Sequence, residues 1–125
     1  MLYQGLENYD DRLTISDDGN AIAFCNYHLI GTQHVFVCTR SGGTWSAPVQ
    51  LTDYSTGGSL PALSADGKKL AFVAHKQLWY AENAGSGWSR PVQLTTNNWW
   101  EENIEYPRFS PDGLSLFYWR VKLTS

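Results

Sequence analysis

The sequence predicts an all-β fold assembled from repeated units of four short antiparallel strands. Two motifs carry this prediction. The pattern Ser-x-Asp-Gly, followed by an aliphatic and then an aromatic residue, begins at Ser16, Ser64 and Ser110, at intervals of 48 and 46 residues. The sequence Trp-Ser-x-Pro-Val-Gln-Leu-Thr begins at Trp45 and again at Trp88. A repeat of about 40–50 residues that joins turns to short strands is typical of β-propeller blades.

The composition fits such a fold and narrows the range of functions. The 125 residues suffice for one domain, 42% of them are hydrophobic and 14% are aromatic. This mixture, with 11 Gly and 5 Pro, indicates a packed core of strands and tight turns. The net charge of -3, without a Lys/Arg cluster, gives no support to nucleic-acid binding. No apolar run approaches the ~20 residues of a membrane span, so no membrane partner is expected.

Residues 1–7 contain neither the basic nor the apolar segment of a secretion signal. We therefore expect a cytoplasmic protein. If the chain is a fragment of a larger exported protein, its location stays open.

Within a single domain of residues 1–125, we expect residues 1–12 to be the remnant of an outer strand followed by a linker. The first blade is expected over residues 13–60. Its four strands are predicted at residues 13–15, 21–25, 35–38 and 45–52. Pro48 suits the outermost of these, because an edge strand does not need its N–H.

The second blade is predicted over residues 61–106, and residues 107–125 are expected to begin a third. Strands of the second blade are predicted at residues 62–64, 70–74, 78–81 and 88–95. Those of the third are predicted at 108–110 and 114–119, with another strand beginning at 121–123. No segment predicts a helix. Residues 99–106 are the only stretch that could be considered one, and they fit a linker better than a helix.

The three Ser-x-Asp-Gly sequences are interpreted as structural turns. The Ser hydroxyl and the Asp carboxylate can bind turn amides, and Gly can adopt a positive φ. The residues concerned are Ser16, Asp18, Gly19, Ser64, Asp66, Gly67, Ser110, Asp112 and Gly113.

Residues 107–113 (Pro-Arg-Phe-Ser-Pro-Asp-Gly) resemble the repeat of TolB-type β-propellers, which reads Pro, a variable residue, an aromatic residue and Ser-Pro-Asp-Gly. Residues 61–67 lack the aromatic residue and the second Pro, and residues 13–19 also lack the first Pro. The resemblance covers nearly the whole chain and implies a propeller related in shape to WD-repeat blades. It implies little about function, because this fold hosts scaffolds, lectin-like binders and gating domains.

The sequence encodes about two and two-thirds blades, fewer than the roughly four to eight of a closed propeller. The partial blades at the two ends are complementary. We therefore expect a homodimer in which the chain ends share a blade and close a ring of about six blades. The alternative is a fragment of a longer single-chain propeller.

The linkers between blades are rich in acidic and aromatic residues, and such linkers cross the face where the central channel opens. They predict a ligand site at the channel mouth. Its candidate residues are Tyr9, Asp10, Asp53, Tyr54, Trp99, Trp100, Glu101, Glu102, Glu105 and Tyr106. Trp99 and Trp100 could instead cover the gap between neighbouring blades.

The histidines and the remaining tryptophans are expected to be structural. His28, His34 and His75 fall near hairpins, without a carboxylate at ligand spacing, so we expect surface or hairpin-packing side chains and no metal. Four tryptophans are expected to pack in the core or between blades: Trp45, Trp79, Trp88 and Trp119.

Cys25 and Cys38 lie on the two arms of one predicted hairpin. A turn centred on residues 31–32 would place them opposite each other. We nevertheless expect free thiols, because a chain without a secretion signal usually stays reduced.

The motifs of nucleophile elbows, redox cysteine pairs, zinc proteases and phosphate-binding loops are missing from the sequence. We therefore expect no enzyme and no cofactor, but a non-catalytic binding module whose partner is a protein segment or a small polar ligand. One alternative is a carbohydrate-binding propeller that stacks sugars on Trp99 and Trp100. Another is a fragment of a peptidase-gating or lyase-like propeller, with a role in folding and assembly only.

Overall fold

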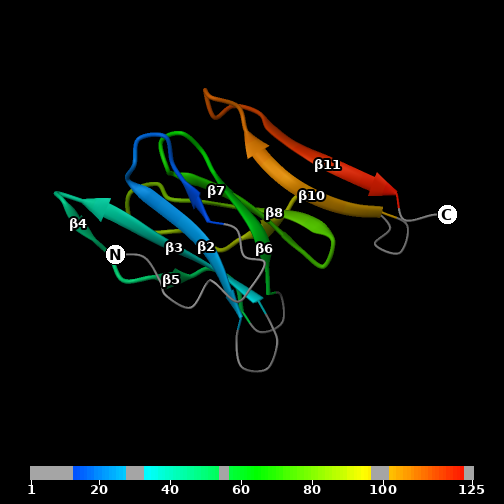
Figure 1. The fold of residues 1–125 in the computed structure, drawn as a ribbon, viewed down its shortest axis with the longest axis horizontal. Helices are drawn as coiled ribbons and strands as arrows, with labels where there is room; N and C mark the ends of the chain where they lie inside the picture. Colours follow the sequence, from blue (N-terminus) through cyan, green and yellow to red (C-terminus); the bar gives the residue numbers. More distant parts are fainter. Residues whose placement is uncertain (1–12, 28–32, 54–56, 97–101, 123–125) are drawn as a thin grey trace.

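The computed structural model describes residues 13–27, 33–53, 57–96 and 102–122, and it forms three antiparallel sheets (Figure 1). The first sheet contains β1 (Thr14–Ile15), β2 (Ala21–Tyr27), β3 (Gln33–Ser41), β4 (Thr44–Trp45) and β5 (Val49–Gln50). The second contains β6 (Ser59–Leu63), β7 (Lys69–Ala74), β8 (Gln77–Glu82) and β9 (Val92–Gln93). The third contains β10 (Glu102–Phe109) and β11 (Leu116–Lys122). In these ranges there is no helix, and hence none long and apolar enough to cross a membrane.

The prediction of an all-β fold with antiparallel sheets is confirmed. Strand order follows chain order in the first two sheets, from β1 to β4 and from β6 to β9. The outer strand predicted at residues 45–52 is instead two short strands, β4 and β5, which both pair with β3. The second sheet shows the same break, with a bridge between Asn83 and Trp88 before β9. A proline lies in each of these two interruptions, Pro48 in the first sheet and Pro91 in the second. Proline has no N–H that could donate a hydrogen bond to the neighbouring strand.

The third sheet corrects two predictions. Residues 102–106, expected to be a linker, belong to β10, so the blade boundary expected after residue 106 falls inside a strand. Val121 and Lys122 do not begin another strand but continue β11, where they pair with Asn103 and Glu102. The polar residues and Pro107 hid β10 from a reading based on hydrophobic alternation, although Ile104 is buried.

Each Ser-x-Asp-Gly sequence forms the same hydrogen-bonded turn. In the second turn, Ser64 Oγ donates to Asp66 Oδ1 at 2.7 Å and accepts from the N–H of Lys69 at 3.0 Å. Asp66 Oδ1 also accepts from the N–H of Lys68 at 3.0 Å, and Gly67, with φ of +72°, donates to the carbonyl of Ser64 at 3.0 Å. The first and third turns repeat all four bonds. The repeated sequence thus specifies one turn geometry three times.

These turns keep their carboxylates ionised. The hydroxyl of Ser16 and the N–H of Asn20 lower the pKa of Asp18 below its ordinary 3.8. The pKa values of Asp66 and Asp112 are lowered by equivalent hydrogen bonds, chiefly from the N–H of Lys68 in the former and from the hydroxyl of Ser110 in the latter.

Neighbouring turns also contact one another. The N–H of Asp18 donates to the carbonyl of Ala65 at 3.0 Å, and Lys69 Nζ donates to the carbonyl of Gly113 at 2.8 Å. A Cβ atom at Gly67 would lie only 2.8 Å from the Cβ of Ala21, so glycine is needed for this approach as well as for its φ. The three turns therefore link the sheets in a row.

The two faces of β7 pack against different neighbours, because successive side chains of a strand point to opposite faces. One face joins the first sheet in a buried cluster that we call the first interface: Ala23, Cys25, Val35, Val37, Leu70, Phe72 and Ala74. The other face joins the third sheet in the second interface: Ala71, Val73, Leu78 and Ile104, with Leu60, Phe109 and Leu116 at its margin. The second sheet is thus enclosed on both sides.

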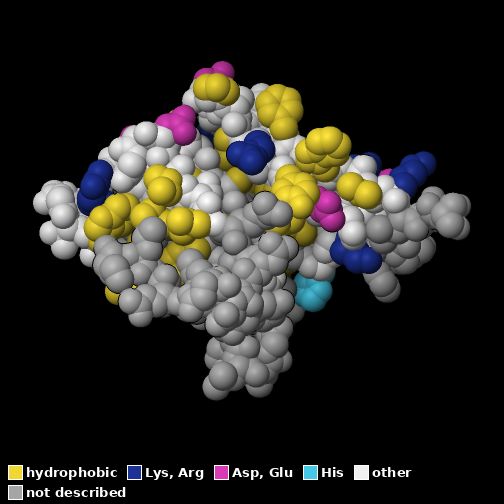
Figure 2. Space-filling model, in the orientation of Figure 1, with side chains coloured by type: hydrophobic (Ala, Val, Ile, Leu, Met, Phe, Trp, Pro, Cys, Tyr) yellow, Lys and Arg dark blue, Asp and Glu magenta, His cyan; other side chains and the backbone are white. Residues whose placement is uncertain are grey.

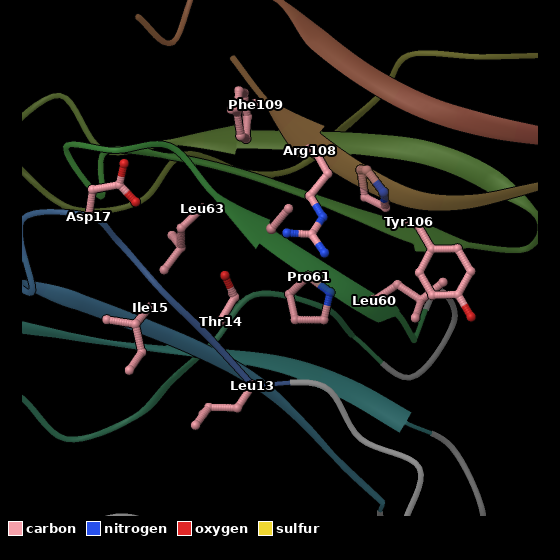
Figure 3. Close-up of a pocket in the computed structure, with 12 residues that line it drawn as sticks. Leu13, Thr14, Ile15, Asp17, Leu60, Pro61, Leu63, Tyr106, Arg108 and Phe109 are labelled. Atoms are coloured by element: carbon pink, nitrogen blue, oxygen red, sulfur yellow. The ribbon is translucent and has the colours of Figure 1, made fainter. Parts of the chain in front are cut away.

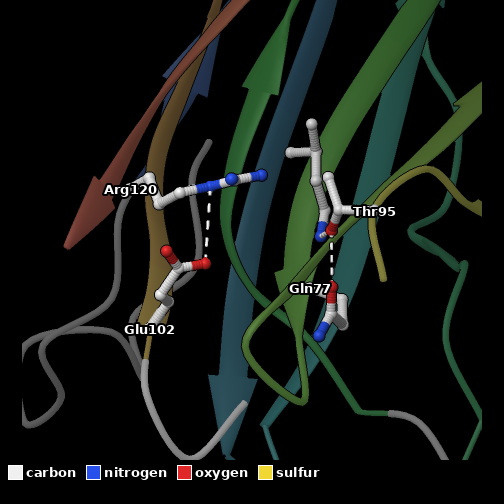
Figure 4. Close-up of polar contacts among 5 residues, drawn as sticks. Gln77, Thr95, Glu102 and Arg120 are labelled. Carbon is white, nitrogen blue, oxygen red and sulfur yellow. Dashed lines mark hydrogen bonds and ion pairs between the residues drawn. The ribbon is translucent and has the colours of Figure 1, made fainter. Parts of the chain in front are cut away.

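Equivalent residues make equivalent polar contacts in the first two sheets. In the second, Thr95 Oγ1 donates to Gln77 Oε1 at 2.6 Å and accepts from the N–H of Leu78 at 2.9 Å (Figure 4). In the first sheet, Thr52 Oγ1 lies 2.8 Å from Nδ1 of His34. It also accepts a hydrogen bond from the N–H of Val35 at 3.2 Å. His34 is therefore a buried side chain within a sheet rather than a surface histidine.

The other histidines and the two cysteines lie in different surroundings from those of His34. His75 is exposed in the turn between β7 and β8, and His28 lies outside the described residues. Cys25 and Cys38 are not joined in a disulfide, and burial raises the pKa of the Cys38 thiol. The prediction that the cysteines face each other is wrong, because Cys25 pairs with Val35.

The four tryptophans lie in three kinds of environment. Trp79 and Trp88 pack against the first interface, as expected, and Trp79 Nε1 donates to the carbonyl of Ala74 at 3.2 Å. Trp45 is 36% exposed and lies under the guanidinium of Arg40, 5.3 Å from the ring centroid. Trp119 is 67% exposed and therefore does not lie in the core of the described chain; its packing between blades stays a prediction.

We expect Ser64→Ala to lower the free energy of unfolding by about 1–2 kcal/mol, since it removes two hydrogen bonds from a side chain that is 1% exposed. The matched substitution Ser110→Ala removes the same bonds from the half-buried third turn and should cost less. Urea denaturation of both variants measures the difference. Equal losses would contradict the role assigned to burial.

Candidate ligand-binding wall

The first strands of the three sheets, β1, β6 and β10, together border a hollow of about 240 Å³ (Figure 3). We call its lining the inner wall. The wall consists of Leu13, Thr14, Ile15, Asp17, Leu60, Pro61, Ala62, Leu63, Tyr106, Pro107, Arg108 and Phe109. Three segments far apart in the sequence therefore contribute equivalent stretches of the repeat to one concave surface.

At one equivalent position in this wall, the three repeats carry chemically different side chains. Thr14, Ala62 and Arg108 each stand two residues before the Ser of their turn, so a hydroxyl, a methyl and a guanidinium occupy equivalent positions. Arg108 is exposed and extends from β10 toward Leu60 and Pro61 of β6 (Figure 3). Among the described residues, Arg108 forms no ion pair. Its guanidinium therefore offers hydrogen-bond donors to the hollow.

Two equivalent β-bulges shape the edge of the wall. The register of β6 shifts between Ser59 and Ala62, and that of β10 shifts between Glu105 and Arg108. Inside these bulges Leu60 and Tyr106 have φ of +53° and +54°, a conformation that costs an L-residue roughly 1–2 kcal/mol. Each is followed by a proline.

The bulge directs the ring of Tyr106, which is 40% exposed, to the border of the hollow (Figure 3). A bulge that re-aims a side chain is a recurrent feature beside functional sites.

The wall combines apolar surface with one charge of each sign. Leu13, just before β1, and Ile15 on β1 are exposed, whereas Phe24 on β2 and Phe72 on β7 are buried. Asp17 lies at the end of the hollow opposite Tyr106, with Arg108 between them (Figure 3). The wall is therefore suited to a ligand that is partly apolar and carries an anionic group near Arg108.

The site predicted from the linkers is only partly brought together. Tyr106 borders the inner wall, but it does so from β10 and not from a linker. Glu102 is also in β10, where its Oε1 lies 3.6 Å from Nε of Arg120 (Figure 4). Glu105 pairs with Trp119 in the same sheet.

Asp53 lies apart, beside a groove between the outer strands of the first two sheets. Six predicted residues fall outside the described ranges: Tyr9, Asp10, Tyr54, Trp99, Trp100 and Glu101.

Sequence reasoning missed the strand residues of the wall, above all Arg108. One signal was available. Aligning the three repeats shows a single charged residue at a position that is Thr in the first copy and Ala in the second. A residue needed only for packing should keep its size and polarity in each copy, so this change marked the position.

No protein-family model matches the sequence, and no curated protein matches it. Solved structures do resemble the fold. The putative TolB from Agrobacterium tumefaciens is 20% identical, with a TM-score of 0.61 over 90% of this chain and 39% of that one. TolB from Acinetobacter baumannii is 18% identical, with a TM-score of 0.55 over 90% of this chain and 29% of that one. The chain thus spans less than two-fifths of the length of either.

At this level of identity the likeness establishes the fold alone. The chain has a TolB-like β-propeller fold, in agreement with the repeat read from its sequence.

The backbone at Tyr106 provides a test of the bulge. At an ordinary strand position Gly is less stable than Ala by about 0.5–1 kcal/mol. At a positive φ the order reverses, so Tyr106→Gly should be more stable than Tyr106→Ala by about 1 kcal/mol. Urea denaturation of both variants gives the difference. The pair Arg108→Gly and Arg108→Ala is the control, in which Ala should be the more stable; the same order at both positions would refute the bulge.

Proposed function

We propose that the chain is a non-catalytic binding module that holds its ligand on the inner wall. The ligand would be a protein segment or a small polar molecule with an acidic group and an apolar group. In a propeller the blades surround a central channel. With β1, β6 and β10 as the strands nearest the axis, the inner wall faces that channel. In this proposal the ligand site lies on the inner strands β1, β6 and β10, and not on the linkers as expected from the sequence.

The observation that carries this proposal is the exposed guanidinium of Arg108, which forms no ion pair with the described residues and lies in a hollow lined by both polar and apolar groups. An arginine presents planar donors that match a carboxylate in a bidentate geometry. Leu13 and Ile15 offer apolar contact on the β1 side of the hollow, across from Arg108, and Tyr106 adds an aromatic ring held at a fixed angle by its bulge (Figure 3). A rigid surface of this kind loses little conformational entropy on binding.

The experiment is a selection from a displayed library of random heptapeptides, followed by affinity measurement of the selected peptides by calorimetry. We expect peptides that contain Asp or Glu next to apolar residues. Arg108→Gln should weaken their binding about ten- to a hundredfold, because a hydrogen bond to a charged group contributes about 1.5–3 kcal/mol.

Arg90→Gln is the matched control, since Arg90 is also exposed but borders the outer groove between the first two sheets. Its affinity should equal that of the wild-type chain. Peptides that bind the Arg108→Gln variant as tightly as the wild type, or a selection without acidic residues, would refute the proposal.

A further inference from the structure

A second hollow, which we call the outer groove, lies between the outer strands of the first two sheets and has a volume of about 600 Å³. This volume falls within the roughly 300–1,000 Å³ of small-molecule pockets. Residues 49–53 line it from the first sheet, and residues 88–91 line it from the second, together with Phe72 and Trp79. Both sheets contain the full set of strands of the repeat. The groove therefore belongs to the boundary between two complete repeats.

Two copies of one sequence motif build the groove. Residues 49–52 are the second half of the first Trp-Ser-x-Pro-Val-Gln-Leu-Thr sequence, and residues 88–91 are the first half of the second copy. The two copies differ at one position only, where Ala47 in the first corresponds to Arg90 in the second. Arg90 is exposed and forms no ion pair with the described residues. The one difference between the copies therefore adds a guanidinium to the lining of the groove.

Two tryptophans give the groove aromatic surface that is held in place. Trp79 stacks on Phe72 with ring centroids 6.4 Å apart, and its Nε1 donates to the carbonyl of Ala74. Trp88 packs against the first interface, and both indoles are half-buried. Rings that are already fixed lose little conformational entropy when a ligand packs on them.

The surroundings of Trp88 differ from those of Trp45, its equivalent in the first copy. The guanidinium of Arg40 lies over the ring of Trp45. Asn83 stands at the position of Arg40 in the second sheet, so this covering contact is not repeated over Trp88. Trp88 lines the groove, whereas Trp45 does not.

Hydrogen-bonding side chains border the same groove. Gln50 Nε2 donates to the carbonyl of Thr52 at 2.6 Å, and Gln50 Oε1 has no partner among the described residues. Ser89 Oγ accepts from the N–H of Glu82 at 3.1 Å and keeps its own hydrogen for another acceptor. Together with Arg90, the groove therefore offers both donors and an acceptor beside its aromatic surface.

The lining favours a neutral ligand over a peptide strand. Gln50 occupies the carbonyl of Thr52, and Pro91 has no N–H, so backbone groups that an added strand would need are missing. One carboxylate, of Asp53, and one guanidinium, of Arg90, give the lining no formal net charge. On the face of the molecule in Figure 2, acidic and basic side chains of the described residues are interspersed rather than gathered by sign.

We propose that the outer groove binds a neutral sugar. A pyranose ring with equatorial hydroxyls carries C–H groups on its faces and hydroxyls around its edge. Its face would pack on the indoles of Trp79 and Trp88, since aromatic rings supply a large apolar contact area. Its hydroxyls would bond with Gln50, Ser89 and Arg90. The site does not rest on the function proposed for the inner wall, because it uses other residues and a ligand of different chemistry.

The first test is calorimetric titration of the chain with three neutral oligosaccharides: cellotriose, maltotriose and triacetylchitotriose. We expect the wild type to bind at least one of them. Arg90→Ala, which restores the residue of the first copy, should weaken that binding about tenfold or more, since it removes hydrogen bonds from a charged donor. Arg108→Gln, the matched control on the inner wall, should bind the sugar as the wild type does.

Three results of this titration would overturn the proposal. They are no binding of any of the three sugars, unchanged affinity in Arg90→Ala, and an equal loss in Arg108→Gln.

The second test locates the bound sugar by the indole N–H signals of the tryptophans in the NMR spectrum, each assigned with a Trp→Phe variant. The signals of Trp79 and Trp88 should shift as the sugar is added. That of Trp45, which has the same place in the motif but does not line the groove, should stay unchanged. Shifts confined to Trp99 and Trp100 would place the sugar on the linker considered from the sequence, and would contradict a site in the groove.

Discussion

The fold depends on the packing of each sheet against its neighbours, because a single sheet cannot cover its own apolar faces. β7 shows this most clearly. Phe72 and Leu70 point into the first interface, while Ala71 and Val73 point into the second. All four are at most 8% exposed. Burial of side chains the size of Leu70, Phe72 and Val73 contributes about 1.5–3 kcal/mol each, so the second sheet is stabilised by both of its neighbours.

The turns position the sheets so that these faces meet. A close approach needs small residues at the points of contact, and the chain supplies them at two places. Gly67 lets the second turn reach β2, and at Gly58 a Cβ would lie 2.9 Å from the side chains of Phe72 and Val35. The same row of turns brings β1, β6 and β10 together at the margin of the packed interfaces, where they form the inner wall.

Much of this architecture could be predicted from the sequence, and the exceptions have physical causes. Repetition revealed the turns and the strands between them, because each copy must satisfy the same backbone groups. β10 was missed because Pro107 and its polar residues resemble a linker; its Pro is accommodated only by a bulge. Arg108 was missed because a candidate site was sought in loops, whereas the wall is made from strands. The exposure of Trp119 could not be foreseen, since it depends on what covers the third sheet.

The central claim is that the first and second sheets stabilise each other through the first interface. Native-state hydrogen exchange in Phe72→Ala tests it most directly, since the change is in one sheet and the readout is in the other. We expect protection of the Val35 and Val37 amides to fall about a hundredfold or more, together with that of β7, because removing a buried Phe side chain costs about 3–5 kcal/mol. Loss of protection confined to β7, with Val35 and Val37 unchanged, would contradict the account.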